Sequence, residues 1–87
     1  MYVIIAYDVN VERVNRVKKF LRQHLNWVQN SLFEGEVTPA DLEEIKMRLK
    51  RIIDGEEDMV VIYRLRGADA MKREIIGVEK SSVDEVI

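Results

Sequence analysis

An 87-residue chain has room for one small domain, which excludes a catalytic domain joined to a separate regulatory one. Hydrophobic residues are 47% of the sequence and charged residues 34%, with four glycines and one proline, a composition typical of a folded domain. Cysteine is absent, so disulfides, thiolate catalysis and cysteine-based zinc or iron–sulfur sites are excluded. The apolar start is too short for a membrane span and has no basic leader, so we expect a cytoplasmic protein.

The net charge of −2 hides a division of charge along the chain. Residues 9–24 hold one acid and five basic residues: Arg13, Arg16, Lys18, Lys19 and Arg22. Residues 34–58 hold nine acids and only four basic residues. The first segment could therefore face phosphate, whereas the second could not. Two solvated helix faces of opposite sign are the alternative, and charge alone favours that alternative.

Hydrophobic spacing predicts a strand and a helix in the first third of the chain. Residues 2–8 are apolar on both alternating faces, which indicates a central strand covered on both sides. From residue 11 to residue 25, apolar side chains recur every three or four positions, which predicts an amphipathic helix. Residues 26–37 are rich in aromatic and branched side chains, so we expect one strand there, bulged at Gly35.

A second helix is predicted mainly from its capping residues. Thr38 is suited to the N-cap, Pro39 to the first helical position, and Asp41 complements the helix dipole. An apolar stripe follows at helical spacing as far as Ile52, and the Asp-Gly pair at 54–55 is expected to end the helix.

The remaining residues predict strands and a connector. Residues 59–65 form a second apolar run typical of a strand, residues 67–74 a connector, and residues 75–78 a short strand. The tail contains Val83, Val86 and Ile87, which could pair as one more strand or stay loose.

This order of elements predicts an α+β domain of the ferredoxin-like β-α-β-β-α-β type over residues 1–78, with a brief fourth strand. Two helices would then cover one face of an antiparallel sheet. Because the first strand is apolar on both faces, the other face needs a second protein surface, and we expect a homodimer packed through the sheets. Residues 79–87 would form a C-terminal extension along the partner's sheet edge.

Few residues could carry catalysis on their own. His24, the only histidine, lies near the end of the first predicted helix, where a surface position is favoured over a catalytic one. The three serines lack a nucleophile-elbow setting, and no phosphate-binding glycine loop is present. Nucleotide-triphosphate and dinucleotide chemistry are therefore not expected.

Asp8 differs from the other acids because it ends an otherwise apolar strand. A carboxylate at that position could bind a hard cation that keeps several waters, whereas the simpler interpretation is that Asp8 or Asn10 caps the next helix. One carboxylate per chain is a poor metal site. If a twofold axis paired two Asp8 side chains, one magnesium or manganese ion could bridge them and supply a nucleophilic water toward phosphodiesters.

Four segments together resemble the CRISPR-associated protein two family: AYDV, ERVNRVKKFL, VQNSLFEGEVTPADLEEIK and DMVVIYRL. The resemblance extends to about residue 78. Its most specific parts are the Tyr-Asp pair after the first strand and the segment Gln-x-Ser-hydrophobic-Phe-x-Gly at residues 29–35. Trp27 and Asn30 depart from the residues that many relatives carry at those positions.

The resemblance implies a homodimer whose C-terminal segments extend the partner's sheet. It also implies a metal-dependent endonuclease acting on RNA or duplex DNA, and a bridging subunit of the CRISPR integrase during spacer acquisition. Carried over by position, Asp8 would be the metal-binding and catalytic aspartate, with magnesium or manganese as cofactor. Tyr7, its aromatic neighbour, would be the second catalytic residue. The implied nucleic-acid contacts, with Arg22 added from its charge, are Arg13, Arg16, Arg22, Ser31 and Phe33.

Three functions remain open at this stage: a nuclease that uses paired Asp8 side chains, a non-catalytic DNA-binding scaffold for the integrase, and an unrelated ligand-binding module. The resemblance disfavours the third. For Phe33 and Trp27, a place in the core or dimer contact is favoured over base stacking. The acids at residues 56–58 are expected in a solvated loop, with contact to a basic partner protein as the alternative.

Overall fold

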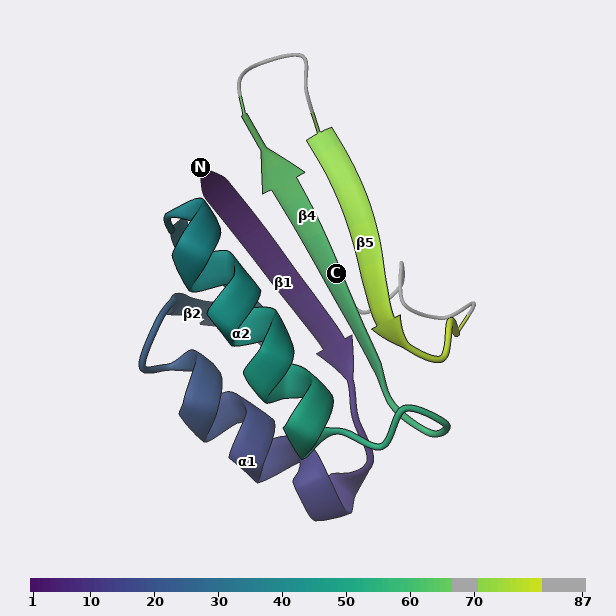
Figure 1. Ribbon diagram of the computed structural model, residues 1–87. Coiled ribbons are helices and arrows are strands. Elements are labelled where there is room, and N and C mark those ends of the chain that lie inside the picture. The colour runs from purple at the N-terminus through teal and green to yellow at the C-terminus, as the bar shows by residue number, and fades with distance from the viewer. Residues whose placement is uncertain (67–70, 81–87) are drawn as a thin grey trace.

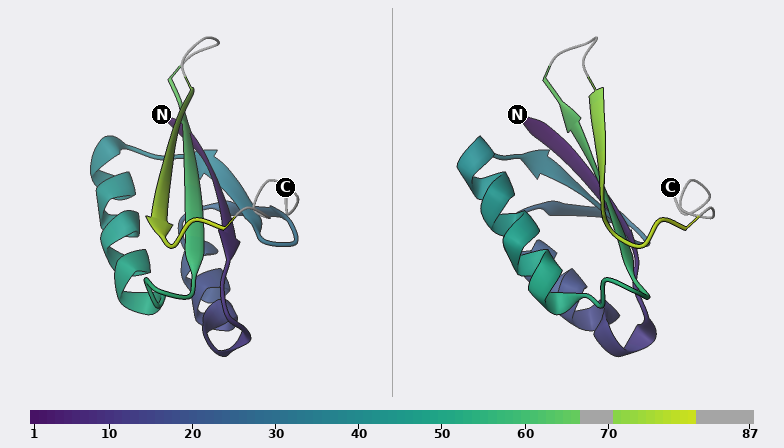
Figure 2. Two further views of the ribbon diagram at one scale, coloured as in Figure 1. Left: turned by 90° about the vertical axis from the view of Figure 1, so that its right-hand side faces the viewer. Right: turned by 45° about the vertical axis from the view of Figure 1, so that its right-hand side comes forward.

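The computed structural model describes residues 1–66 and 71–80 of the chain (Figure 1). In this part of the chain the elements are β1 (Tyr2–Asp8), α1 (Val11–Leu21), β2 (Asn26–Gln29), β3 (Leu32–Glu36), α2 (Pro39–Ile52), β4 (Met59–Leu65) and β5 (Met71–Gly77). All neighbouring strands are antiparallel, in the sheet order β2-β3-β1-β4-β5. Both helices cover one face of this sheet (Figures 1 and 2), so the predicted ferredoxin-like α+β class is confirmed.

β1 lies in the middle of the sheet, between β3 and β4. Its residues Val3, Ile5 and Tyr7 are buried in the main core beneath the helices. Successive side chains of a strand point to opposite faces, so Asp8 projects from the face away from the helices. Met59, directly opposite Asp8 in the register, belongs to a separate small apolar cluster on that same face.

The helix starts follow the predicted capping chemistry. The Thr38 side chain accepts a hydrogen bond from the Asp41 backbone, and Asp41 in turn accepts one from the Thr38 backbone, which completes a capping box. The α1 cap is Asn10, whose side chain accepts from the backbone N–H of Glu12. Asp8 is therefore not the helix cap. α1 ends at Leu21, four residues before the predicted end, and a hydrogen-bonded turn follows.

The single strand predicted for residues 26–37 is wrong, because this segment forms the hairpin β2–β3. Asn30 adopts a left-handed backbone with φ of 44°, which reverses the chain, and its carbonyl accepts a hydrogen bond from the Trp27 indole at 3.0 Å. The register irregularity lies between Trp27 and Gln29 rather than at Gly35. Gly35 instead permits close packing, since a Cβ there would lie 3.1 Å from Leu25.

The short strand predicted at residues 75–78 is also corrected. β5 begins at Met71 and runs antiparallel to β4 at the sheet edge, while β4 is itself the fourth ferredoxin-like strand. β5 begins with the exposed Met71, and the exposed, charged Lys72 and Arg73 follow, so the start of this strand showed no apolar run. Residues 67–70 of the predicted connector and residues 81–87 of the predicted extension, including Val83, Val86 and Ile87, lie outside the described residues.

Candidate functional site

The Asp8 carboxylate lies at the end of β1 and is accessible, with 38% of its side chain exposed. Its nearest charged neighbour is Lys80, whose Nζ lies 3.6 Å from Asp8 Oδ2 and donates to the Asp8 carbonyl at 3.4 Å. Both distances are long for a tight contact. The carboxylate thus attracts a cation already, and this cation comes from the segment that follows β5.

Tyr7 and Phe33 lie behind Asp8 as parts of the core. Tyr7 is 1% exposed and Phe33 is fully buried, and their rings stack with centroids 6.2 Å apart. The Ser31 side chain hydrogen-bonds the Tyr7 hydroxyl. Burial raises the pKa of Tyr7, against the smaller lowering effects of this bond and of Arg22. In this structure no face of the Phe33 ring is open to a base, and Phe33 has the core position that the sequence favoured over base stacking.

Arg13 is held by acids rather than presented to solvent. Its Nε donates to Asp58 Oδ2 at 2.6 Å, Nη2 donates to Asp58 Oδ1 at 3.2 Å, and Glu57 lies 3.4 Å from Nη2. This bidentate contact with Asp58 raises the pKa of Arg13 further above its usual value. The expectation that the acids at residues 56–58 form a solvated loop is therefore wrong for Asp58, which is fully buried.

Asp58 organises the corner of the fold beside Asp8. Besides Arg13, its carboxylate accepts backbone hydrogen bonds from Asn10 and Asp54, each at 2.8 Å, and its carbonyl accepts one from Val78 at 2.9 Å. Burial acts to raise the pKa of Asp58, but the hydrogen bonds from Arg13, Asn10 and Asp54 outweigh it and lower the pKa to about 2. The Asp58 carboxylate thus joins the start of α1 to the residue that follows α2, and the Asp58 carbonyl adds the end of β5.

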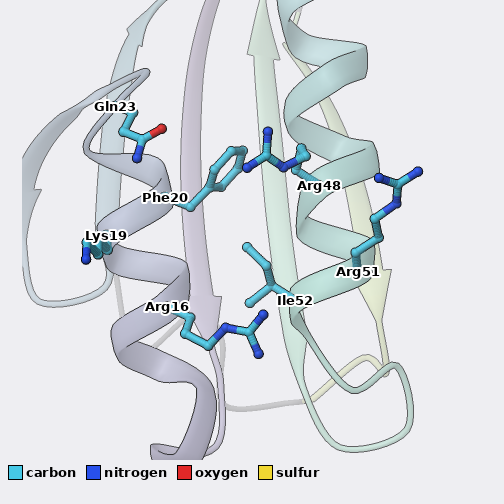
Figure 3. A pocket seen from close by; sticks show the side chains of 7 residues that line it. All are labelled: Arg16, Lys19, Phe20, Gln23, Arg48, Arg51 and Ile52. Atoms are coloured by element: carbon cyan, nitrogen blue, oxygen red, sulfur yellow. The ribbon is translucent and has the colours of Figure 1, made fainter.

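The other basic residues of the first predicted helix remain exposed. Arg16 lies on α1 and Arg22 at its C-terminal cap, and both are exposed, whereas Ser31 is half-buried after the β2–β3 turn. Arg16 lines a groove of about 330 Å³ between the helices, together with other basic residues from both (Figure 3). The structure thus separates Arg16 and Arg22, which are accessible, from Arg13, which is engaged in the corner.

Comparison with known proteins identifies the family of this chain. A model of the family described as CRISPR associated protein Cas2 matches residues 1–73. This chain belongs to the Cas2 family. The resemblance stated from the sequence is thereby confirmed.

Individual relatives support the assignment. A protein of Archaeoglobus fulgidus named CRISPR-associated endoribonuclease Cas2 2 is 75% identical over 92% of this chain and 87% of the relative. The CRISPR-associated endoribonuclease Cas2 of Thermococcus kodakarensis is 63% identical over the full length of both chains. A crystal structure titled as that of Cas2 superimposes with a TM-score of 0.74 at 54% identity, over 93% of this chain and 91% of the other.

The described residues of one chain hold no cluster of metal ligands around Asp8. Among residues 1–66 and 71–80, no three acidic or histidine side chains come close enough together to hold an ion. Asp8 offers oxygen ligands of the kind that Mg²⁺ and Mn²⁺ prefer, but one carboxylate per chain is too few. Within the same residues, no helix is long and apolar enough to cross a membrane.

Sequence reasoning missed the roles of Asp58, of Lys80, and of the pair Arg48 and Arg51. Asp58 was counted among the solvated acids, and Lys80 was given no role. Arg48 and Arg51 were hidden because they lie in a segment whose total charge is negative. A helical signal was present, since residues three apart on a helix share a face, as in the pairs Arg16–Lys19 and Arg48–Arg51.

Proposed function

We propose that this protein is a metal-dependent endoribonuclease of a CRISPR system, acting in the cytoplasm as a homodimer joined through the sheets. The position of Asp8 carries this proposal. Its accessible carboxylate ends a central strand on the face away from the helices, and it is not used as a helix cap. The names of relatives with 75% and 63% identity support ribonuclease activity.

A dimer formed through the open sheet faces would give each Asp8 a twin across the twofold axis. Two carboxylates could then hold one Mg²⁺ or Mn²⁺, which would supply a water of lowered pKa as the nucleophile toward a phosphodiester. The chain's own part is to fix the position of the two carboxylates. Pairing of β1 with β3 and β4, together with the Asp58 corner, holds the end of β1 for this purpose.

The decisive experiment compares Asp8→Asn with the control Glu44→Gln. The control removes one exposed acid from α2, on the side of the sheet opposite to Asp8. Metal-stimulated cleavage of RNA should fall at least about a hundredfold in Asp8→Asn and stay at the parent level in Glu44→Gln. Sedimentation should give the mass of a dimer for all three proteins. Cleavage that survives in purified Asp8→Asn, or full activity from a monomer, would overturn the assignment.

A second candidate is a non-catalytic scaffold that binds duplex DNA and joins the CRISPR integrase. The observation that favours it is the lack of a complete metal-ligand set among the described residues of one chain, beside several accessible cations. In that case Asp8→Asn should bind duplex DNA as the parent does, and the parent should show no metal-stimulated cleavage. Cleavage by the parent that depends on Asp8 would exclude the purely structural role.

A further inference from the structure

The groove between α1 and α2 gathers four cations on the face of the sheet opposite to Asp8. Its lining residues are Arg16, Lys19, Phe20, Gln23, Arg48, Arg51 and Ile52, and none of them is acidic. In Figure 3, Arg16 from α1 and Arg48 from α2 extend into the groove from opposite sides, Arg48 beside Phe20 and Arg16 below Ile52, whereas Lys19 and Arg51 lie at its two sides. The volume, about 330 Å³, leaves room for a ligand between these side chains.

These four cations lack the acidic partners that other basic side chains have. Lys46, for example, lies 2.9 Å from Glu74 and 3.2 Å from Glu43. Of the ion pairs formed among residues 1–66 and 71–80, none includes a cation of the groove. The guanidinium of Arg48 instead lies over the aromatic ring of Phe20, 5.0 Å from the ring centroid. Several cations that line one groove without acidic partners favour a bound anion.

Helix dipoles explain only part of this arrangement. Lys19 and Arg51 lie in the last turns of α1 and α2, where a positive charge is favourable. Arg16 lies in the middle of α1, and Arg48 lies one turn before the end of α2, so neither gains much from a dipole. The helix dipoles therefore leave the positions of Arg16 and Arg48 on this groove unexplained.

We propose that this groove binds the phosphodiester backbone of a nucleic acid. The inference deepens the proposed function and rests on it only for the choice of nucleic acid as ligand, because the groove needs neither Asp8 nor a metal. Repeated phosphates match cations supplied from two helices, and the guanidinium groups of Arg16, Arg48 and Arg51 can each donate two hydrogen bonds to a phosphate. The side chain of Gln23 adds a polar contact of the same kind.

An acidic protein segment fits the groove less well. Stable protein contacts depend on aromatic or aliphatic side chains that anchor in exposed apolar pockets. Here the aromatic ring, Phe20, is 5% exposed and lies beneath Arg48. The surface therefore offers charge and hydrogen bonds with little apolar area, which is the pattern of backbone contacts to nucleic acids.

The groove also stays open in the proposed dimer. Contact through the sheets would cover the face that carries Asp8 and Met59, whereas α1 and α2 cover the opposite face (Figure 2). Each dimer would then present two basic grooves, one on each outer side. A nucleic-acid strand could be bound in one groove while another part of the same strand reaches the centre of the dimer.

The test measures binding without cleavage, in an Asp8→Asn background with chelator present, so that failure of the nuclease assignment leaves it unaffected. Lys19→Glu/Arg51→Glu alters the groove, and Lys50→Glu/Lys72→Glu makes the same charge change at exposed lysines outside it. Single-stranded RNA and duplex DNA of one sequence are titrated at several salt concentrations. Polyglutamate serves as the acidic-protein probe, and circular dichroism verifies folding of each variant.

We expect the groove variant to bind more weakly than the control variant. The groove variant removes two phosphate contacts, so binding should release fewer counterions. The slope of log affinity against log salt should therefore fall in magnitude by about 1.4 for single-stranded RNA, or by about 1.8 for duplex DNA. Equal affinities and slopes in the two variants would overturn the proposal, as would no binding by the parent. Loss of polyglutamate binding with nucleic-acid binding retained would assign the groove to an acidic protein instead. If a glutamate variant misfolds, the corresponding glutamine variants carry the same comparison.

Discussion

The guanidinium of Arg13 binds the buried carboxylate of Asp58 through two nitrogens, with Nε 2.6 Å from Oδ2 and Nη2 3.2 Å from Oδ1. This contact joins α1 to the residue just before β4, across 45 residues of sequence. The side chain of Arg13 is 18% exposed and that of Asp58 is not exposed at all. The corner next to Asp8 therefore depends on a charged pair, which makes Arg13 a structural residue in this fold.

Replacing Arg13 with glutamine should destabilise the protein strongly. The variant leaves Asp58 buried without its charged partner, and losing one member of a buried pair costs about 3–5 kcal/mol. Urea unfolding measures the change. Arg16→Gln removes the same charge from an exposed site on the same helix, and its free energy of unfolding should stay within about 0.5 kcal/mol of the parent. Equal stabilities of the two variants would contradict the structural role of Arg13.

The free energy of unfolding should also depend on pH in the acidic range where Asp58 titrates. Its pKa is lowered from 3.8 to about 2 in the folded state, so folding favours the ionised form. The resulting stabilisation, about 2 kcal/mol, is fully present above about pH 4 and is lost as the pH falls through 2. Unfolding of the parent and of Asp58→Asn, compared from pH 6 to pH 2, should therefore give a difference that shrinks by about this amount. A difference independent of pH would contradict the assignment.

The capping residues and apolar spacing predicted both helices, because these signals are local in sequence. Thr38 and Asp41 form the expected capping box, and β4 covers the predicted apolar run. The Arg13–Asp58 pair could not be predicted in this way. Its members are far apart in sequence, and each one alone has the character of a surface charge.

The sheet edges were predicted less well, for a related reason. β2 is exposed along its whole length, and the first half of β5 is exposed and mostly charged, so neither shows the apolar pattern of a buried strand. The strand-end position of Asp8 was predictable, since it follows from a long apolar run. The groove between the helices was not, because its cations meet only after α1 and α2 pack together.

Gly77 should be intolerant of any side chain. Its φ of +93° is unfavourable for other residues, and a Cβ there would overlap the carbonyl oxygen of Asp58. Gly77→Ala should therefore lower the free energy of unfolding by about 3 kcal/mol or more. Gly55 is the matched control, because a Cβ at that position meets nothing within 4 Å. Gly55→Ala should leave stability unchanged or raise it by up to about 1 kcal/mol. Similar losses in both variants would contradict the close approach at Gly77.

Tyr7→Phe should separate a packing role from a catalytic one. The Tyr7 hydroxyl is buried and hydrogen-bonded by Ser31, and burial raises its pKa, so it stays protonated at neutral pH and cannot act as a base. Removing the hydroxyl should cost about 1 kcal/mol of stability. The rate of RNA cleavage should remain within about threefold of the parent, since the ring touches the core rather than the substrate. A loss of about a hundredfold or more with the fold intact would make Tyr7 a catalytic residue.

Ser31→Ala provides the check on that interpretation. It leaves the buried Tyr7 hydroxyl without its partner, which should cost about 1–3 kcal/mol, more than removal of the hydroxyl itself. In the double variant Tyr7→Phe/Ser31→Ala, no polar group remains unpaired, and part of the lost stability should return. Strictly additive losses from the two substitutions would show that the two side chains do not depend on each other. The hydrogen bond with Ser31 would then not explain why the Tyr7 hydroxyl is buried next to Asp8 in the sequence.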